Sequence, residues 1–142
     1  MMLESYIRNR LAEKDILLMT HIVMGYPSFD ASLRIIQIMV DAGVDLMELQ
    51  IPFAEPTSDG PVIVRANQEA LKGGVTLKDC FKFIEQVTRT FDIPFLIMSY
   101  YTIPFRFGLK RFVNTMSNCG LRGAIIPDLP REEGRVYPVS YT

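Results

Sequence analysis

Cysteine and histidine are scarce in this chain of 142 residues, which has two cysteines, one histidine and no tryptophan. Cys80 and Cys119 lie far apart in segments of helical periodicity. They have neither the spacing of metal ligands nor the number needed for a disulfide framework. The sequence therefore predicts no metal site and a reducing, cytoplasmic setting.

Long hydrophobic runs and an excess of one charge are also missing. No apolar run approaches the roughly 18 residues that a membrane span needs. The N-terminal stretch "MMLESYIRNRLAEKD" mixes charged and apolar residues and lacks the apolar centre of a signal peptide. A formal net charge of -1 provides no basic field for nucleic acid. We therefore expect neither a membrane nor a nucleic acid as a partner.

What the sequence does contain is an alternation of strand and helix patterns. Apolar runs rich in β-branched residues predict four strands, at residues 16–27, 46–53, 93–100 and 123–129. Helical periodicity and end signals predict helices at residues 1–15, 28–43, 61–74, 76–91 and 108–120. This order predicts an α/β fold with a parallel sheet in a single domain spanning residues 1–142. The pattern leaves open a doubly wound sheet and part of a (βα)8 barrel.

Polar residues gather at or near the carboxyl ends of these strands. Glu48 and Gln50 share one face of the second strand. Tyr100 and Asp128 end faces of the third and fourth strands whose other members are apolar: Leu96 and Met98 in the third, Ala124 and Ile126 in the fourth. Barrels and open α/β sheets both build their sites at this edge. The pattern therefore supports the presence of a functional site more strongly than it supports either fold.

Glu48 and Asp59 are the main chemical candidates. A glutamate in a strand interior is unfavourable unless it is paired or used, and two carboxylates in different environments can divide acid and base roles. Glu48 could instead pair with a neighbouring cation, and Asp59 could cap the helix that begins at Pro61. Without further information, these residues predict an acid/base site for an unknown substrate.

Three segments resemble the tryptophan synthase alpha chain family: "THIVMGYPSFDAS", "DLMELQIPFAEPTSDGPVIVRANQEAL" and "IIPDLPREE". The resemblance extends from about Leu17 to Glu133. It implies a (βα)8 TIM barrel, of which this chain holds about the first four βα units. It also implies retro-aldol cleavage of indole-3-glycerol phosphate to indole and glyceraldehyde 3-phosphate, in the cytoplasm. The implied partner is a beta chain in an alpha2beta2 heterotetramer; pyridoxal phosphate belongs to that chain, and no cofactor is expected here.

The resemblance also implies roles for single residues. Glu48 matches the acid/base that protonates the indole ring carbon, and Asp59 matches the carboxylate that contacts the indole N–H from a loop closing as a lid. Tyr100 and Asp128 match substrate-site residues, although Tyr100 could equally be core filler. His21 is expected to be a residue of the core or the lumen wall and not a catalytic histidine. It is therefore grouped with the substrate-binding residues.

The chain departs from the family in sequence and in length. Gln50 stands where the family usually has glycine, which could narrow the ring pocket; Ala54-Glu55 and "YYTIPF" also differ from the usual motifs. A family barrel needs about 250 residues, so the C-terminal half and its phosphate-binding loops are expected to be absent. The alternative function is a truncated, non-catalytic half-barrel that self-associates or docks a beta chain. Unpaired edge strands and a water-exposed lumen face carrying Leu96, Met98 and Ile126 are expected to drive the self-association.

Overall fold

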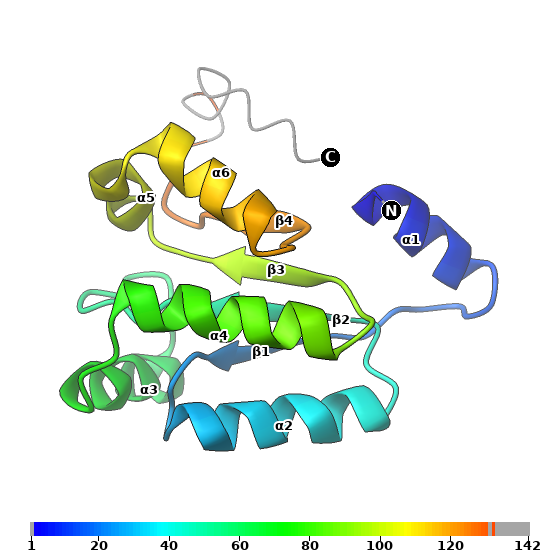
Figure 1. The fold of residues 1–142 in the computed structure, drawn as a ribbon, viewed down its shortest axis with the longest axis horizontal. Helices are drawn as coiled ribbons and strands as arrows, with labels where there is room; N and C mark the ends of the chain where they lie inside the picture. Colours follow the sequence, from blue (N-terminus) through cyan, green and yellow to red (C-terminus); the bar gives the residue numbers. More distant parts are fainter. Residues whose placement is uncertain (1, 131, 133–142) are drawn as a thin grey trace.

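A parallel sheet forms the centre of the computed structural model, which describes residues 2–130 and 132 (Figure 1). Its strands are β1 (Met19–Val23), β2 (Leu46–Gln50), β3 (Phe95–Met98) and β4 (Gly123–Ile125). They lie side by side in chain order, and each adjacent pair is parallel. The predicted parallel α/β arrangement is confirmed over the described part of the predicted domain; residues 1, 131 and 133–142 lie outside it.

Helices connect these strands and precede the first of them. They are α1 (Leu3–Leu11), α2 (Phe29–Asp41), α3 (Pro61–Lys72), α4 (Leu77–Thr90), α5 (Thr102–Phe107) and α6 (Leu109–Asn118). Helix α3 begins with Pro61 at its first position, as predicted. Helix α4 begins with the predicted capping box, in which Thr76 and Asp79 exchange side-chain to backbone hydrogen bonds.

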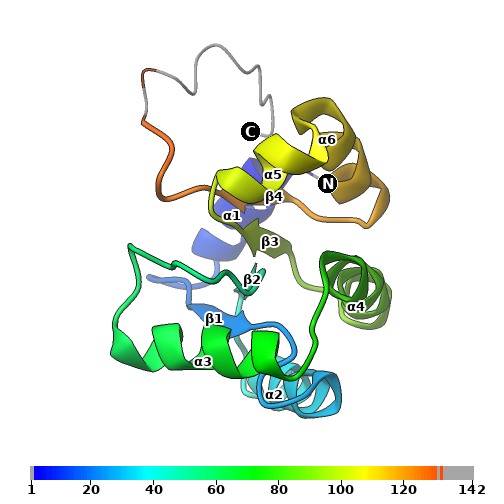
Figure 2. The same ribbon diagram turned by 90° about the vertical axis from the view of Figure 1, so that its left-hand side faces the viewer.

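The main core lies between the sheet and helices α2, α4 and α6. Figure 2 shows α2 and α4 along one side of the sheet and the segment from β2 to α3 on the other. The strands supply the residues of one alternation to this core, among them Met47, Leu49, Phe95 and Ile97. The amphipathic helices supply Ile36, Phe83, Ile84, Val87, Phe112 and Met116. Burying each such side chain stabilises the fold by about 1.5–3 kcal/mol.

The opposite alternation forms the lumen face, which consists of His21, Val23, Glu48, Gln50, Leu96, Met98, Gly123 and Ile125 in aligned registers. The predicted exposure of this face is wrong for Leu96 and Met98, which are 8% and 5% exposed. A side chain at Gly123 would meet Leu96 Cδ2 at 2.9 Å and Leu3 Cδ2 at 3.9 Å. The Leu96 side chain therefore lies over the bare backbone of β4, with α1 close beside it.

All four strands are shorter than predicted. Residues 16–18 precede β1, and Ile16 and Leu18 are exposed because β1 is an edge of the described sheet. In β4, Ala124 aligns with Ile97 and packs on the main core, whereas Ile125 aligns with Met98 on the lumen face. The predicted shared face of Ala124, Ile126 and Asp128 is therefore wrong, because the strand ends at Ile125 and the chain then turns.

Asp45, the residue before β2, binds the N-terminal segment that contains helix α1. The Asp45 carboxylate, 1% exposed, accepts hydrogen bonds from Arg10 Nη2 at 2.9 Å, Lys14 Nζ at 2.7 Å and the Leu18 backbone N–H at 2.9 Å. The Tyr6 hydroxyl donates to the Asp45 carbonyl at 2.8 Å. The hydrogen bonds from Lys14, Leu18 and Arg10 lower the pKa of Asp45 to about 2.

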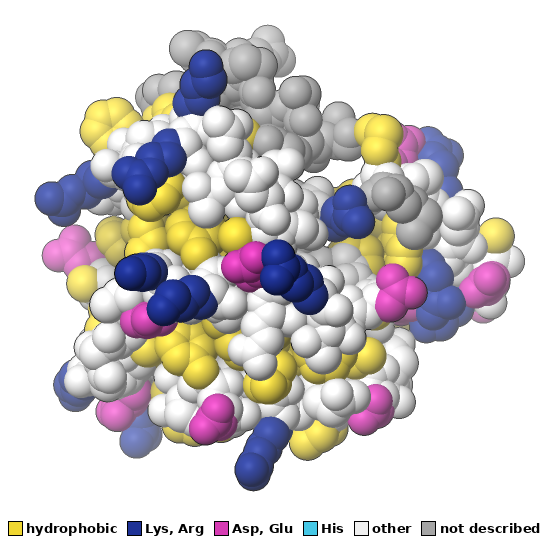
Figure 3. Space-filling view, viewed as in Figure 1, with side chains coloured by type: hydrophobic (Ala, Val, Ile, Leu, Met, Phe, Trp, Pro, Cys, Tyr) yellow, Lys and Arg dark blue, Asp and Glu magenta, His cyan; other side chains and the backbone are white. Residues whose placement is uncertain are grey.

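The helix-covered face carries Lys and Arg side chains interspersed with Asp and Glu, with hydrophobic side chains visible between them (Figure 3). Single exposed apolar side chains of this kind are ordinary for a protein surface. Within the described ranges, none of the helices has the length and apolar character required to cross a bilayer.

Candidate active site

His21 and Glu48 lie next to each other on the lumen face. They are register partners on β1 and β2, with Leu96 opposite Glu48 on β3. Glu48 is half-buried, and none of the ion pairs found within residues 2–130 and 132 includes it. The alternative in which Glu48 pairs with a lysine or arginine is therefore wrong for this part of the chain.

Asp59 reaches the same face from the loop that joins β2 to α3. Its Oδ2 accepts hydrogen bonds from Gln50 Nε2 at 2.8 Å and from the Tyr100 hydroxyl at 2.9 Å. The residue that caps α3 is Gly60, without a side-chain hydrogen bond. The alternative role of Asp59 as a helix cap is wrong, because its carboxylate turns toward the strands.

Gln50 connects the polar residues of this site, and sequence reasoning missed that role. Its side chain is 0% exposed, and its Oε1 lies 2.6 Å from His21 Nε2. Its Nε2 donates to Asp59 Oδ2 and lies 3.5 Å from Asn67 Oδ1. The available signal was its position two residues beyond Glu48, on the same face of the strand.

Asn67 of α3 is a second residue that sequence reasoning missed. It is 0% exposed; its Oδ1 accepts from the Phe53 backbone N–H at 2.7 Å, and its Nδ2 donates to the Ile63 carbonyl at 2.8 Å. It lies between Ala66 and the buried Ala70 on the inner side of α3. A polar residue on an otherwise small, apolar helix face was the signal. Asn67 fixes the start of the loop that carries Asp59.

Tyr100 fixes the far end of that loop. Its ring is 1% exposed and stacks on Phe53 with centroids 5.1 Å apart. Its hydroxyl accepts from the Ser58 backbone N–H at 3.0 Å and donates to Asp59. The structure thus gives Tyr100 both a packing role and a polar contact with the candidate carboxylate.

Asp128 lies apart from this cluster. It is exposed, and its Oδ1 accepts from the Tyr101 backbone N–H at 2.8 Å. This hydrogen bond fixes the segment between β3 and α5. The structure therefore brings together four of the five predicted site residues and leaves Asp128 in the neighbouring loop.

Burial sets the proton affinities in the site. Desolvation raises the pKa of Glu48; nearby Asp59 raises it further, whereas His21 lowers it. Desolvation and the hydrogen bond to Asp59 raise the pKa of Tyr100, so its hydroxyl stays protonated and donates. A carboxyl group with a raised pKa is suited to donate a proton near neutral pH.

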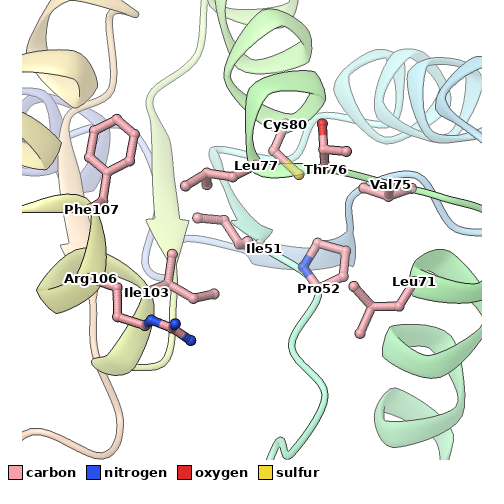
Figure 4. Close-up of a pocket in the computed structure, with 10 residues that line it drawn as sticks. All are labelled: Ile51, Pro52, Leu71, Val75, Thr76, Leu77, Cys80, Ile103, Arg106 and Phe107. Atoms are coloured by element: carbon pink, nitrogen blue, oxygen red, sulfur yellow. The ribbon is translucent and has the colours of Figure 1, made fainter.

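An apolar pocket of about 360 Å³ lies on another part of the molecule (Figure 4). It is lined by residues of α3, α4, α5 and the segment that follows β2, including Leu71, Leu77, Cys80, Ile103 and Arg106. None of the five predicted site residues lines it. Burial raises the pKa of the Cys80 thiol to about 12, which makes it a poor nucleophile. No group of three or more potential metal ligands occurs within residues 2–130 and 132.

Comparisons with known proteins agree with this architecture. Residues 7–139 match the family model of the tryptophan synthase alpha chain. The tryptophan synthase alpha chain of Syntrophotalea carbinolica is 60% identical over 136 residues, which cover 96% of this chain and 54% of that relative. This chain therefore spans about half the length of its curated relatives.

Solved structures have the same fold. A protein from Aquifex aeolicus matches with a TM-score of 0.89 and 37% identity, over 96% of this chain and 55% of that one. A tryptophan synthase from M. tuberculosis matches with a TM-score of 0.87 and 28% identity, over 94% and 53%. The sheet described here is part of a (βα)8 barrel. The chain belongs to the tryptophan synthase alpha chain family.

Proposed function

We propose that this chain is the catalytic N-terminal part of a lyase of tryptophan biosynthesis that cleaves indole-3-glycerol phosphate to indole and glyceraldehyde 3-phosphate. The observation that carries the proposal is the placing of Glu48 and Asp59 on one face, in different surroundings. Glu48 is a half-buried carboxyl group with a raised pKa. Asp59 is a loop carboxylate held by two hydrogen bonds.

In this reaction Glu48 donates its proton to the ring carbon that bears the glycerol side chain. The bond between that carbon and the side chain then breaks, and its electron pair remains with the ring. The hydroxyl group on the departing carbon becomes an aldehyde and loses its proton, which Glu48 can accept. The net change moves one proton from the hydroxyl to the ring carbon, so the chemistry consumes no cofactor.

Asp59 stabilises the positive charge that protonation creates on the ring. Both of its described hydrogen bonds go to Oδ2. Within residues 2–130 and 132, no hydrogen bond to Oδ1 is found, so this oxygen can accept the ring N–H. Preorganised charge of this kind is often the largest catalytic contribution. Tyr100 holds Asp59, His21 lines the ring pocket, and Asp128 shapes the adjacent loop.

Turnover is proposed to need the rest of the barrel, because the matched relatives are about twice as long as the region they share with this chain. That part would supply the phosphate-binding loops. The proposed partner is a beta chain in an alpha2beta2 assembly in the cytoplasm, and pyridoxal phosphate would reside there.

A second candidate function is a non-catalytic half-barrel that binds a beta chain or another copy through its open edges and the region Pro56–Leu71. The observation that favours it is that β1 and β4 are the outer strands of the described sheet. Edge strands with unpaired backbone groups readily accept a neighbouring chain.

The test joins the chain to the C-terminal part of the Syntrophotalea carbinolica relative and measures indole release from indole-3-glycerol phosphate. The lyase proposal expects turnover by the folded hybrid and little by the chain alone. A folded hybrid that binds the substrate without releasing indole would contradict the lyase function. If the hybrid is inactive, capture of the beta chain by the chain alone would favour the second candidate.

A further inference from the structure

The hydrogen bonds around Gln50 determine which way its amide points. Asn67 Oδ1 accepts from the Phe53 N–H, and Asp59 Oδ2 accepts from the Tyr100 hydroxyl, so both groups present acceptors to Gln50. The amide nitrogen must therefore face Asp59 and Asn67, which leaves Oε1 facing His21 Nε2 at 2.6 Å. An amide oxygen cannot donate, so His21 Nε2 must carry a proton.

The same reasoning fixes the donors around Asp59. The Ser58 backbone N–H donates to the Tyr100 oxygen at 3.0 Å, which leaves the Tyr100 hydroxyl proton directed at Asp59 Oδ2. Gln50 Nε2 is the second donor to that oxygen, from a side chain that is 0% exposed. Two donors, one at the end of β2 and one in the segment after β3, thus hold one oxygen of a carboxylate that the loop carries.

We propose that Gln50 is a positioning residue that connects His21 to Asp59, holding the carboxylate over the lumen before any ligand arrives and keeping the His21 proton on Nε2. The meaning of this role for catalysis rests on the proposed lyase function, because Asp59 Oδ1 is the atom offered to the ring N–H. The preformed arrangement reduces the ordering that binding would otherwise require.

Nitrogen-15 NMR of the histidine ring tests the inference in the chain itself. His21 is the only histidine, so its ring signals need no separation from others. At a pH of about 8, where an ordinary imidazole is neutral, we expect the proton on Nε2. A ring protonated on Nδ1 would overturn the proposal, and this measurement requires no variant.

Variants at position 50 test separately the hydrogen bond of Gln50 to His21 and its hydrogen bond to Asp59. Gln50→Met keeps the volume and removes the amide, so the His21 proton should distribute over both nitrogens. Exchange of the Ser58 and Asp59 backbone N–H groups should rise about tenfold or more, as expected for the loss of a hydrogen bond to a charged group. Gln50→Glu can still accept from His21 but cannot donate to Asp59. It should keep the Nε2 proton while loosening the loop.

Gln37→Met is the matched control, because Gln37 Nε2 also donates to an aspartate, Asp41, at 2.8 Å, but on the exposed side of α2. It should leave the His21 signals and the loop exchange unchanged. A folded Gln50→Met chain that behaves like the parent in both measurements would refute the positioning role. Neither measurement depends on turnover, so failure of the lyase assay and failure of this inference are distinguishable.

Discussion

At the scale of single residues, the carboxyl groups of the lumen face are partly buried. Glu48 has His21 beside it on β1 and no lysine or arginine partner within the described residues, so burial dominates its protonation. A fully solvated carboxyl group would be almost entirely ionised at neutral pH. The raised pKa retains part of the population in the form that can donate a proton.

Glu48→Gln should therefore lower the lyase rate of the complete barrel about 10²–10⁴-fold, the usual worth of a positioned acid. The free energy of unfolding should change little, because the shape is kept and a buried charge is removed. Steady-state indole release and urea denaturation of the same preparation check both expectations. A variant with nearly parental rate would remove Glu48 from the mechanism.

Asp45 is expected to control stability rather than chemistry. Asp45→Asn should lower the unfolding free energy at pH 7 by about 1.5–3 kcal/mol, because the partly exposed cations Arg10 and Lys14 lose their buried anionic partner. The pKa of Asp45 is lowered to about 2 in the fold, below the ordinary value of about 3.9. Its stabilisation is therefore complete above pH 4 and disappears as the pH falls toward 2.

Urea titrations of the parent and Asp45→Asn between pH 7 and pH 2.5 test this expectation, and the difference between the two should shrink on acidification. Asp41→Asn on exposed α2 provides the control and should shift stability by less than about 0.5 kcal/mol. A parent–variant gap that is constant across the pH range would contradict the assigned role.

Glu48 and Asp59 could be predicted as a pair because residue type and strand position already restrict what a carboxylate can do there. The connecting role of Gln50 could not be predicted. Which donor meets Asp59 depends on how the loop after β2 folds back. That path is set by Asn67, which lies 14 residues from Phe53, and by Tyr100, which lies 41 residues from Asp59 and 42 from Ser58.

At the scale of elements, the loop from β2 to α3 is held at both ends and exposed between them. Asn67 holds Phe53, and Tyr100 holds Ser58. Ala54 and Glu55 between them are exposed. A loop that closes as a lid, as the family resemblance implies, is expected to be mobile along the whole segment 54–60. These contacts restrict that expectation to its first part.

We expect the Ala54 and Glu55 backbone N–H groups to exchange with solvent much faster than that of Ser58 in the free chain. Binding of indole or a beta chain should slow them, as closure of a lid does. Hydrogen exchange resolved by residue, with and without the partner, measures this difference. Equal protection along the loop in both states would rule out a lid.

Elements with strong local signals could be predicted, and those that depend on context could not. Thr76 and Asp79 predict the start of α4 because the capping box is formed within four residues. The sequence predicts no helix at residues 102–107, where the structure has α5, a helix that contains Pro104. Pro104 lies in the first turn of α5, where backbone N–H groups have no intrahelical acceptor. The absence of an N–H on proline therefore costs no helical hydrogen bond at this position.

At the scale of the whole molecule, the described sheet has two open edges. Beside β1, the side chains of Ile16, Leu18 and Met19 are 80%, 55% and 44% exposed. Apolar side chains next to unpaired backbone groups favour association with another strand. Since Leu96 and Met98 are buried, the edge of β1, rather than the open lumen, is the surface that we expect to drive self-association.

The isolated chain should therefore form dimers or larger species at micromolar concentration, and Ile16→Lys with Leu18→Glu should shift it toward monomer. The phosphate-binding loops are proposed to lie in the part of the relatives that this chain does not cover, so it should also bind indole-3-glycerol phosphate little better than indole. Light scattering and calorimetric titration measure the two effects. A monomeric parent that turns over the substrate at an ordinary rate would contradict both.

The closeness of Leu3 to Gly123 has a consequence for biosynthesis. These residues lie at opposite ends of the described chain, yet the Leu3 side chain comes within 3.9 Å of the position of a Gly123 Cβ. A ribosome makes the N-terminus first, so α1 must wait until β4 has left the exit tunnel before this contact can form. Until then, the Leu96 side chain lacks the covering that it has in the folded chain, where it is 8% exposed. Contacts this distant in sequence form late and slowly, so this part of β3 stays accessible to other apolar surfaces for longer than the local contacts of the helices do.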